Sequence, residues 1–377
     1  MQAQQTRIGI LGGTFNPIHF AHLEMAQMAK NALRLEHVLL VVANDPPHKT
    51  VHEGVSAEKR YTMTMHAAAG KEGLAVSDIE LRRQGKSYTI DTVLELQQQH
   101  PDAVFFVIVG SDMLLQLGTW HRAEELLKMV TFVSVPRDAY STQDEIAAHK
   151  LRTQYGANIT ILHSPALPIS STLIRDRVFD AQPITGFLPQ VAERYIYAEG
   201  LYLPPKIAAL HTACKERLSE RRFLHTMGVV ETAVWLADRY DADAEKTRIA
   251  ALLHDIGRSV EHDALLHAPA GEKIAKSEYN IHDEDILQAI RLHTTLRAEA
   301  TVLDKVIYLA DMIEPSRTYE GVEELRALAG KGLDAAVLHG LRLTIAHLQA
   351  KQIPVQEHSL RAVEVLEQAA GETGARR

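Results

Sequence analysis

The sequence predicts a chain of two halves: an α/β half built on a doubly wound parallel sheet, followed by an all-α half. Short β-rich runs alternate with amphipathic helical stretches over residues 1–203, which is typical of a parallel sheet covered by helices. A pair of prolines then interrupts the chain. After it the strand signals disappear and long helical periods follow, which predicts a separate helical domain.

Five runs in the first half have the apolar, β-branched composition of buried strands. They are Arg7–Leu11, His37–Ala43, Val104–Val109, Thr131–Val135 and Asn158–Leu162. Helical periodicity lies between them, for example over Phe20–Leu33 and Ser87–Gln99. Because a helical crossover joins neighbouring parallel strands, these runs should form one open sheet with helices on both faces.

The stretch Tyr202–Lys206, which contains the paired prolines, predicts a linker between domains 1–203 and 207–377, since proline ends regular structure and favours an extended chain. The tail Gly371–Arg377 should fray. Six stretches of the second half have an apolar helical period: Arg222–Tyr240, Ala244–His254, Asp283–His293, Val302–Ile313, Val322–Ala329 and Leu333–Ala350.

Composition and charge narrow the class of protein. The chain has 377 residues, of which 46% are hydrophobic, and its 40 basic and 48 acidic side chains give a net charge of −8. This argues against a disordered chain and against a nucleic-acid partner. No apolar run is long enough to span a membrane, and no signal peptide is recognisable. A single cysteine, Cys214, favours a reducing, cytoplasmic setting; the oligomeric state is left open.

A glycine-rich turn joins the first predicted strand to the first predicted helix. Gly12 and Gly13 let the backbone approach a ligand closely, and the start of the helix offers N–H groups and a positive dipole end to an anion. His19 and His22 are three residues apart and therefore project to one side of the helix. Together these residues predict a phosphate-binding site.

Two motifs carry a family resemblance. The run Gly12-Gly13-Thr14-Phe15-Asn16-Pro17-Ile18-His19 with His22, and the later run Ile169-Ser170-Ser171-Thr172-Leu173-Ile174-Arg175, resemble the signatures of the nucleotidylyltransferase superfamily. Asn16 and Ala21 stand where that superfamily usually has aspartate and glycine. The stretches Pro46–Lys49, Ser87–Thr92 and Val109–Asp112, followed by Trp120, are similar to nicotinate mononucleotide adenylyltransferases.

This resemblance implies a Rossmann-like fold that transfers the adenylyl group of ATP to nicotinate mononucleotide, giving deamido-NAD and pyrophosphate, with Mg²⁺ as cofactor. The catalytic groups would be His19, His22 and Arg175. ATP would contact Gly12, Gly13, Thr14, Phe15, Gly110, Asp112, Ser171 and Thr172. The mononucleotide would contact His48, Lys49, Thr89 and Trp120. Two alternatives stay open: Trp120 is an ordinary core aromatic, or the domain uses another acceptor such as phosphopantetheine or another nucleotide donor such as a cytidylyl donor.

Histidines and aspartates recur inside the apolar helical pattern of the second half. His225, the pair His254-Asp255, and Asp311 all lie in such stretches. Ionisable groups on a core-facing stripe are costly unless they are paired or bind a metal. With one cysteine in the chain, a metal site has to rely on imidazole and carboxylate, which suit iron, manganese or zinc. The remaining histidines are interpreted as ordinary core or surface residues: His211, His262, His282, His339, His347 and His358.

The order His225, His254-Asp255, Asp311 resembles the HD metal-dependent phosphohydrolase superfamily. The stretches Ala250–Arg258, Leu265–Gly271, Ala289–Thr295 and Tyr308–Arg317 are similar to the branch that hydrolyses diadenosine tetraphosphate to two ADP. The resemblance implies that iron or another divalent transition metal binds His225, His254, Asp255 and Asp311, and that Asp255 is also catalytic. A second metal or substrate phosphate would be bound by Arg258, His267, His293, Thr294 and Arg317.

Three departures from that branch concern its substrate pocket. Leu296 replaces the usual glycine, Arg258 replaces a common lysine, and the segment between Asp255 and His267 is short. Two alternatives therefore stay open for the second half. It is a nucleotide-binding regulatory module without turnover, or it hydrolyses another nucleotide such as a deoxynucleoside triphosphate.

Overall fold

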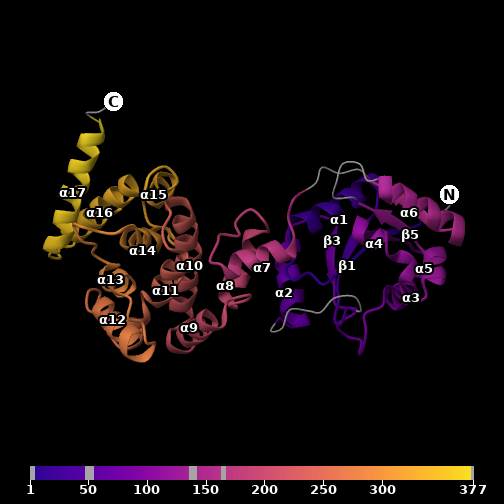
Figure 1. The fold of residues 1–377 in the computed structure, drawn as a ribbon, viewed down its shortest axis with the longest axis horizontal. Coiled ribbons are helices and arrows are strands. Elements are labelled where there is room, and N and C mark those ends of the chain that lie inside the picture. The colour runs from indigo at the N-terminus through magenta and orange to yellow at the C-terminus, as the bar shows by residue number, and fades with distance from the viewer. Residues whose placement is uncertain (1–4, 47–54, 136–141, 163–166, 375–377) are drawn as a thin grey trace. The chain divides into compact units, whose positions relative to one another are not determined.

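A computed structural model describes residues 5–46, 55–135, 142–162 and 167–374 (Figure 1). The chain divides into two compact units. The first consists of Met1–Arg175 and Ile184–Tyr195, and the second of Asp176–Pro183 and Ile196–Arg377. None of the described helices is long and apolar enough to cross a membrane.

The first unit is built on one parallel sheet of six strands, in the order β3-β2-β1-β4-β5-β6. The strands are β1 (Arg7–Gly13), β2 (His37–Val42), β3 (Leu74–Ser77), β4 (Val104–Val109), β5 (Thr131–Ser134) and β6 (Asn158–Ile161). Strand β1 pairs with both β2 and β4, so the winding of the sheet reverses there. This is the Rossmann-like order, and the predicted fold class is confirmed. Ligands bind such sheets beyond the carboxyl ends of the strands at the reversal.

Strand burial follows the position of each strand in the sheet. Ile8, Leu40 and Val107 on the inner strands are almost fully buried, because a parallel sheet is covered on both faces. All five predicted strands are present. Strand β3 was not predicted: it has four residues, lies at the edge of the sheet and is only partly buried, so its sequence carries little strand signal.

Helices connect the strands of the first unit. They are α1 (Phe20–Leu33), α2 (Ala57–Ala68), α3 (Thr89–Gln99), α4 (Ser111–Leu114), the 3₁₀ helix η1 (Leu117–Thr119), α5 (Ala123–Met129) and α6 (Thr142–Tyr155), with α7 (Ser171–Phe179) and α8 (Gln190–Ala198) following. Helix α1 has the predicted bounds. Helix α3 begins two residues after the predicted start, because the Ser87 hydroxyl instead accepts hydrogen bonds from the backbone N–H groups of Asn44 (3.1 Å) and Asp45 (3.3 Å).

All regular elements in the described part of the second unit are helical. They continue as α9 (Pro205–Arg217), α10 (Glu220–Tyr240), α11 (Ala244–Leu253), the 3₁₀ helix η2 (Ile256–Ser259), α12 (His267–Glu278), α13 (Glu284–Leu292), α14 (Val302–Ile313), α15 (Val322–Ala329), α16 (Leu333–Ala350) and α17 (Glu357–Gly374). Each of the six predicted helices is present. Side chains of Ser219, Asp243, Asp283 and Thr301 cap their helices by accepting backbone N–H groups. Helix α17 continues to Gly374, so the part of the tail from Gly371 to Gly374 is helical rather than frayed.

The paired prolines of the predicted linker lie at the start of a helix. Pro204 is the N-cap of α9 and Pro205 is its first residue, a position that tolerates proline because its N–H would have no partner within the helix. In the division into two compact units, the residues from Ile196 onward belong to the second unit, so both prolines lie within it. Buried Arg248 of α11 also ties Asp176–Pro183 to this unit, since its Nη1 donates to the carbonyl groups of Val178 (2.7 Å) and Phe179 (3.2 Å).

Candidate functional sites

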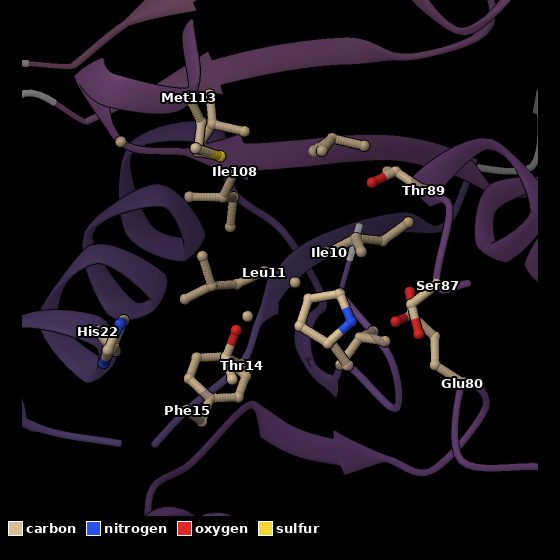
Figure 2. Close-up of a pocket in the computed structure, with 18 of the residues that line it drawn as sticks. Ile10, Leu11, Thr14, Phe15, His22, Glu80, Ser87, Thr89, Ile108 and Met113 are labelled. Carbon is tan, nitrogen blue, oxygen red and sulfur yellow. The ribbon is translucent and has the colours of Figure 1, made fainter. Parts of the chain in front are cut away.

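A cavity of about 800 Å³ lies at the carboxyl ends of β1 and β4 in the first unit (Figure 2). Every described residue that the sequence analysis assigns to the adenylyl-transfer site lines it: Gly12, Gly13, Thr14, Phe15, His19, His22, Thr89, Gly110, Asp112, Trp120, Ser171, Thr172 and Arg175. The remaining two, His48 and Lys49, lie outside the described residues. Residues predicted from separate motifs thus meet in one cavity.

The glycine-rich turn at the end of β1 is shaped by close packing. A Cβ atom on Gly13 would lie 2.8 Å from the ring of Phe15, and Phe15 itself has a left-handed φ of 46°. Arg60, which is only 1% exposed, donates to the carbonyl groups of Thr14 (2.6 Å) and Asn44 (3.2 Å). These contacts hold the turn, whose residues line the cavity.

Two imidazoles stack at the start of α1. His19 is the N-cap residue of this helix and is buried. The rings of His19 and His22 lie 3.7 Å apart between centroids, and the edge of Phe15 packs against His22 at 5.1 Å. Because the N-terminus of a helix attracts anions, both rings stand where they can donate hydrogen bonds to phosphate oxygens.

The second motif is bonded directly to the first. Arg175 donates from Nη1 to the carbonyl of Asn16 (2.7 Å) and from Nη2 to the Thr172 hydroxyl (3.1 Å). The Ser171 hydroxyl donates to the carbonyl of Pro17 at 2.8 Å. The start of α7 is thereby held beside the start of α1. Since Arg175 uses the backbone of Asn16, the replacement of the usual aspartate does not affect this bond.

Aromatic and hydroxyl side chains line another part of the cavity, where Thr89 is the first residue of α3. The rings of Tyr88 and His121 stack at 4.3 Å. Trp120 lines the cavity and also packs edge-on against the core residue Phe132 at 6.2 Å. The indole of Trp120 therefore borders the cavity on one side and packs against the core on the other.

The buried carboxyl group of Glu80 is a cavity residue that the sequence analysis missed. Glu80 follows β3, is 7% exposed and accepts a 2.6 Å hydrogen bond from the Thr92 hydroxyl. Figure 2 shows it beside Ser87, on the opposite side of the cavity from His22. Burial raises the pKa of Glu80, although hydrogen bonds from Thr92 and Ser87 and the charge of Arg83 oppose this. No motif surrounds it, so nothing in the sequence marked it.

This raised pKa leads to a pH-dependent prediction for stability. Ionisation of a carboxyl group whose pKa is raised by folding opposes folding, so its stabilising contribution is lost as pH rises through the folded-state pKa. We expect Glu80→Gln, which cannot ionise, to gain stability relative to the parent as the pH rises above about 4, the ordinary pKa of a glutamate. Urea unfolding would be followed by Trp120 fluorescence in a Trp235→Phe background. Exposed Glu72→Gln is the control, and a Glu80→Gln difference that stays constant with pH would contradict the prediction.

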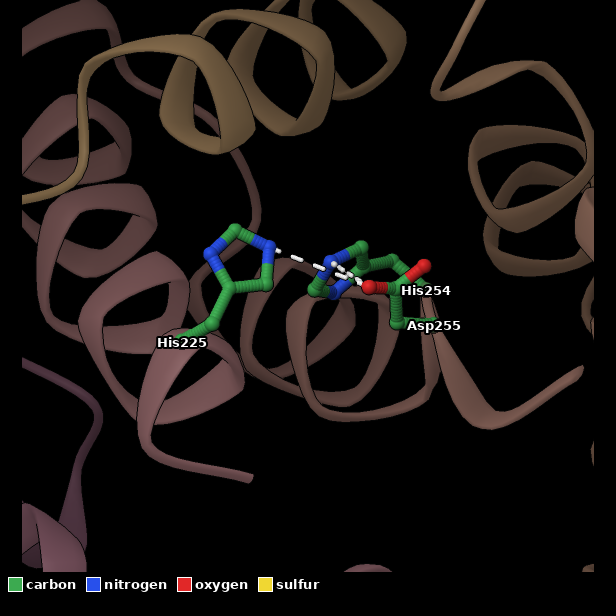
Figure 3. A group of neighbouring side chains, drawn as sticks. All are labelled: His225, His254 and Asp255. Atoms are coloured by element: carbon green, nitrogen blue, oxygen red, sulfur yellow. Dashed lines mark ion pairs between the residues drawn. The ribbon is translucent and has the colours of Figure 1, made fainter. Parts of the chain in front are cut away.

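The second candidate site is a buried cluster of histidine and aspartate side chains in the second unit. Helix α10 contributes His225, and His254 and Asp255 follow α11; Figure 3 shows both imidazoles beside the carboxylate. Potential ligand atoms of these three residues lie within 4.8 Å of one another, and so do those of Asp255, His267 and His293. The two groups share Asp255, and the structure thus brings together five residues predicted for this site.

The two oxygens of Asp255 serve different groups. Oδ2 lies 3.6 Å from His254 Nε2 and 3.8 Å from His225 Nε2. Oδ1 lies 3.2 Å from His267 Nε2 and 3.7 Å from His293 Nε2. A carboxylate with one oxygen in each group has the geometry to bridge two cations.

The four imidazoles are oriented as metal ligands. The Nδ1 atoms of His254, His267 and His293 lie 2.7, 3.0 and 2.8 Å from the carbonyl groups of Ala251, Asp263 and Ile290, and His225 Nδ1 lies 3.0 Å from Glu314 Oε1. An Nδ1–H donor to a carbonyl in His254, His267 and His293 leaves Nε2 of these rings facing the cluster, and Nε2 of His225 faces it as well. His267 Nε2 and His293 Nε2 then face each other at 3.1 Å, an arrangement that a cation would stabilise. The donor set fits a divalent transition metal.

The protonation states of the carboxyl groups in the cluster also suit the binding of a cation. Burial would raise the pKa of Asp255, but the facing imidazoles of His254, His267 and His293 hold it well below its usual range. Burial lowers the pKa of His254 to about 4. Asp311, whose Oδ1 lies 2.9 Å from His225 Nε2, has a pKa lowered by His225 and Arg317 despite its burial. Near neutral pH the carboxylates are therefore ionised and His254 is neutral. Burial would lower the pKa of His225, but hydrogen bonds to Asp311 and Glu314 raise it to about 9, so this imidazole is protonated when no metal is bound.

Guanidinium groups flank the cluster. Arg317 donates to Asp311 Oδ1 at 2.5 Å, and Arg222 donates to Asp255 Oδ2 at 2.7 Å. Arg258 Nε lies 3.8 Å from Asp255 Oδ1, while its Nη1 donates to the carbonyl of His262 at 2.7 Å. Arg222 was not predicted, although its position three residues before His225 on α10 places both on one helix face.

Thr294 directly follows His293 and is half-buried. Its predicted contact with phosphate stays a prediction.

Comparison with known proteins separates the two halves in the same way. Residues 10–177 match the cytidylyltransferase-like family, and residues 222–316 match the HD domain. The fold and the two sites thus define a nucleotidyltransferase-type domain joined to an HD domain in one chain.

The relatives of the first half are more specific. A probable nicotinate-nucleotide adenylyltransferase from Halalkalibacterium halodurans is 43% identical over 197 residues, which are 52% of this chain and 91% of that protein. A second from Synechococcus sp. (strain JA-3-3Ab) is 41% identical over 206 residues, 54% of this chain and 97% of that protein. The chain belongs to the nicotinate-nucleotide adenylyltransferase family.

Among solved structures, a predicted HD superfamily hydrolase involved in NAD metabolism from Clostridium acetobutylicum is 35% identical, with a TM-score of 0.41. The match covers 43% of this chain and 96% of that one.

Proposed function

We propose that the first unit transfers the adenylyl group of ATP to nicotinate mononucleotide, releasing pyrophosphate and forming deamido-NAD. The observation that carries the proposal is the meeting of His19, His22 and Arg175 around one cavity at the reversal of the sheet. The relatives from Halalkalibacterium halodurans and Synechococcus, each named as a probable nicotinate-nucleotide adenylyltransferase, support the same reaction.

The reaction needs no protein nucleophile. A phosphate oxygen of the mononucleotide attacks the α-phosphorus of ATP, the bond from this phosphorus to the bridging oxygen breaks, and pyrophosphate leaves. The protein aligns the two substrates and stabilises the charge that develops. His19, His22 and Arg175 would donate to the triphosphate oxygens, and Mg²⁺ bound with the nucleotide would neutralise part of its charge.

The other substrate contacts are proposed from the family resemblance, and the lining of the cavity supports them where the residues are described. The backbone of Gly12, Gly13 and Phe15, with the hydroxyls of Ser171 and Thr172, would bind ATP. Gly110 and Asp112, directly after β4, would contact its ribose. Trp120 would stack on the pyridine ring and Thr89 would bind the nicotinate carboxylate. His48 and Lys49 are proposed to contact the mononucleotide phosphate.

The His19→Ala variant tests this proposal. We expect kcat to fall about 10²–10⁴-fold, because the variant loses a donor that acts on the transition state, while the protein stays folded. Pyrophosphate release with ATP and nicotinate mononucleotide measures the rate, and phosphopantetheine serves as the alternative acceptor. His100→Ala, at an exposed position, is the control. Wild-type turnover in His19→Ala would refute the proposed role.

We propose that the second unit is a metal-dependent phosphohydrolase that cleaves diadenosine tetraphosphate to two ADP. Support comes from the match to the HD domain, the shared carboxylate of Asp255 between two ligand groups and the flanking arginines. The proposed metal is iron or another divalent transition metal, bound by His225, His254, Asp255 and Asp311. His267 and His293 would bind a second ion through the other oxygen of Asp255.

The residues of the cluster would have different roles in hydrolysis. A bound metal would supply an activated water molecule and polarise a phosphoryl oxygen. Asp255 belongs to both groups of potential ligands, so we expect it to be required for catalysis. Arg222, Arg258 and Arg317 carry the positive charge that a polyphosphate chain requires.

Asp255→Asn provides the test for the second unit. We expect at least about a 10³-fold loss of diadenosine tetraphosphate hydrolysis and a loss of bound metal, because the amide removes the shared charge. Adenylyl transfer should be unchanged. A metal chelator should abolish hydrolysis in the parent, and re-addition of Fe²⁺ should restore it.

Measurements of bound metal and of nucleotide hydrolysis on the parent protein distinguish the alternatives for the second unit. Bound metal without turnover of any nucleotide would favour a regulatory module. Cleavage of a deoxynucleoside triphosphate in preference to diadenosine tetraphosphate would replace the proposed substrate.

A further inference from the structure

Glu314 is a buried carboxylate next to the cluster that neither ligand group includes. It follows α14 directly, three residues after Asp311, and is 1% exposed. Its Oε1 lies 3.0 Å from Nδ1 of His225. The carboxylate thus contacts the side of the imidazole that faces away from Asp255 and Asp311.

The partner of His225 differs in kind from the partners of the other three imidazoles. His254, His267 and His293 each place Nδ1 against a backbone carbonyl, whereas His225 places it against a carboxylate. An Nδ1–H donor to a carboxylate fixes the ring orientation and makes Nε2 more basic. His225 Nε2 lies 2.9 Å from Asp311 Oδ1 and 3.8 Å from Asp255 Oδ2, so Nε2 faces the cluster, where a metal would replace the proton that it shares with Asp311.

Several contacts hold Glu314 in this place. The backbone N–H of Ser316 donates to Oε2 at 2.7 Å, and the Ser316 hydroxyl donates to Oε1. Arg317 Nε lies 3.7 Å from Oε1. Both carboxylate oxygens are therefore occupied, and rotation of the group away from His225 would break these bonds.

Gly228 on α10 makes room for this carboxylate. A Cβ atom at Gly228 would lie 2.6 Å from Glu314 Oε2 and 3.3 Å from its Cδ. Glycine weakens the interior of a helix, so its presence one turn after His225 calls for a local reason, which the close approach of Glu314 supplies.

We propose that Glu314 is a positioning residue that fixes the tautomer and orientation of His225 for metal binding, and that Gly228 admits its carboxylate. This inference rests on the proposed metal centre. It predicts that the affinity for a divalent metal depends on a residue that does not touch the metal.

The test is a Co²⁺ titration of the full-length, metal-stripped protein. Affinity is measured by competition with a chromophoric chelator, and the visible spectrum of bound Co²⁺ reports the ligand geometry. We expect Glu314→Gln to bind about 10–100-fold more weakly than the parent, with an altered spectrum. Glu320→Gln makes the same chemical change at an exposed position and should bind like the parent.

Gly228→Ala provides an independent variant because it displaces the carboxylate without removing it. Its affinity should fall in the same direction, and the double variant Gly228→Ala/Glu314→Gln should lose less than the sum of the two, since both act through one contact. Ser316→Ala should cause a smaller loss. Circular dichroism and its thermal melting check that the helical second unit of each variant is folded. If Glu314→Gln does not fold, the results for Gly228→Ala and Ser316→Ala test the proposal instead.

The possible results separate this inference from the proposed function. Parent-like affinity and spectrum in folded Glu314→Gln, or in both Gly228→Ala and Ser316→Ala, would overturn the positioning role and leave the metal centre intact. Failure of the parent itself to bind Co²⁺ would overturn the metal centre and, with it, this inference.

Discussion

The organisation of the second unit depends on the burial of one charged group, the carboxylate of Asp255. A buried charge is tolerated only when its surroundings compensate it, and here imidazoles from several helices and two guanidinium groups do so. Helix packing is adapted to bring them close. A Cβ atom on Gly257 would lie 2.0 Å from the carbonyl oxygen of His267, so η2 and α12 meet backbone to backbone and His267 comes within reach of Asp255.

The first unit has to bind an anion although the chain has a net charge of −8. Its cavity has to attract polyphosphate, and it does so with local positive groups: the start of α1, the imidazoles of His19 and His22, and the guanidinium of Arg175. Coupling Arg175 to the backbone of Asn16 fixes that charge where two distant segments of sequence meet. Overall acidity and anion binding are compatible because salt screens charges that lie more than about 8–10 Å away, so that nearby groups dominate the field in the cavity.

The sequence was informative wherever a residue's role follows from its own type and spacing. The buried strands, the glycine turn and the histidine–aspartate order belong to this group. Strand β3 was not predictable because it is short and lies at an edge. Glu80 and Glu314 acquire their roles only through burial and partners distant in sequence. The backbone at Leu296 shows why the resembled branch usually has glycine at this position. Its φ of 59° lies in the left-handed region, for which glycine is the usual residue.

Comparison of the two ligand groups around Asp255 shows that they are not equivalent. The group of His225 and His254 is surrounded by three carboxylates, since Asp311 lies 2.9 Å from His225 Nε2 and Glu314 contacts its Nδ1. For the group of His267 and His293, the described structure gives only Asp255 as a facing carboxylate. Attraction between opposite charges grows as their distance and the local dielectric constant fall. The first group therefore places more carboxylate charge close to a cation, although Arg222 and Arg317 pair with two of its carboxylates. The carboxylate of Glu314 adds to this difference from behind the ring, so the asymmetry of the cluster and the orientation of His225 have the same physical origin.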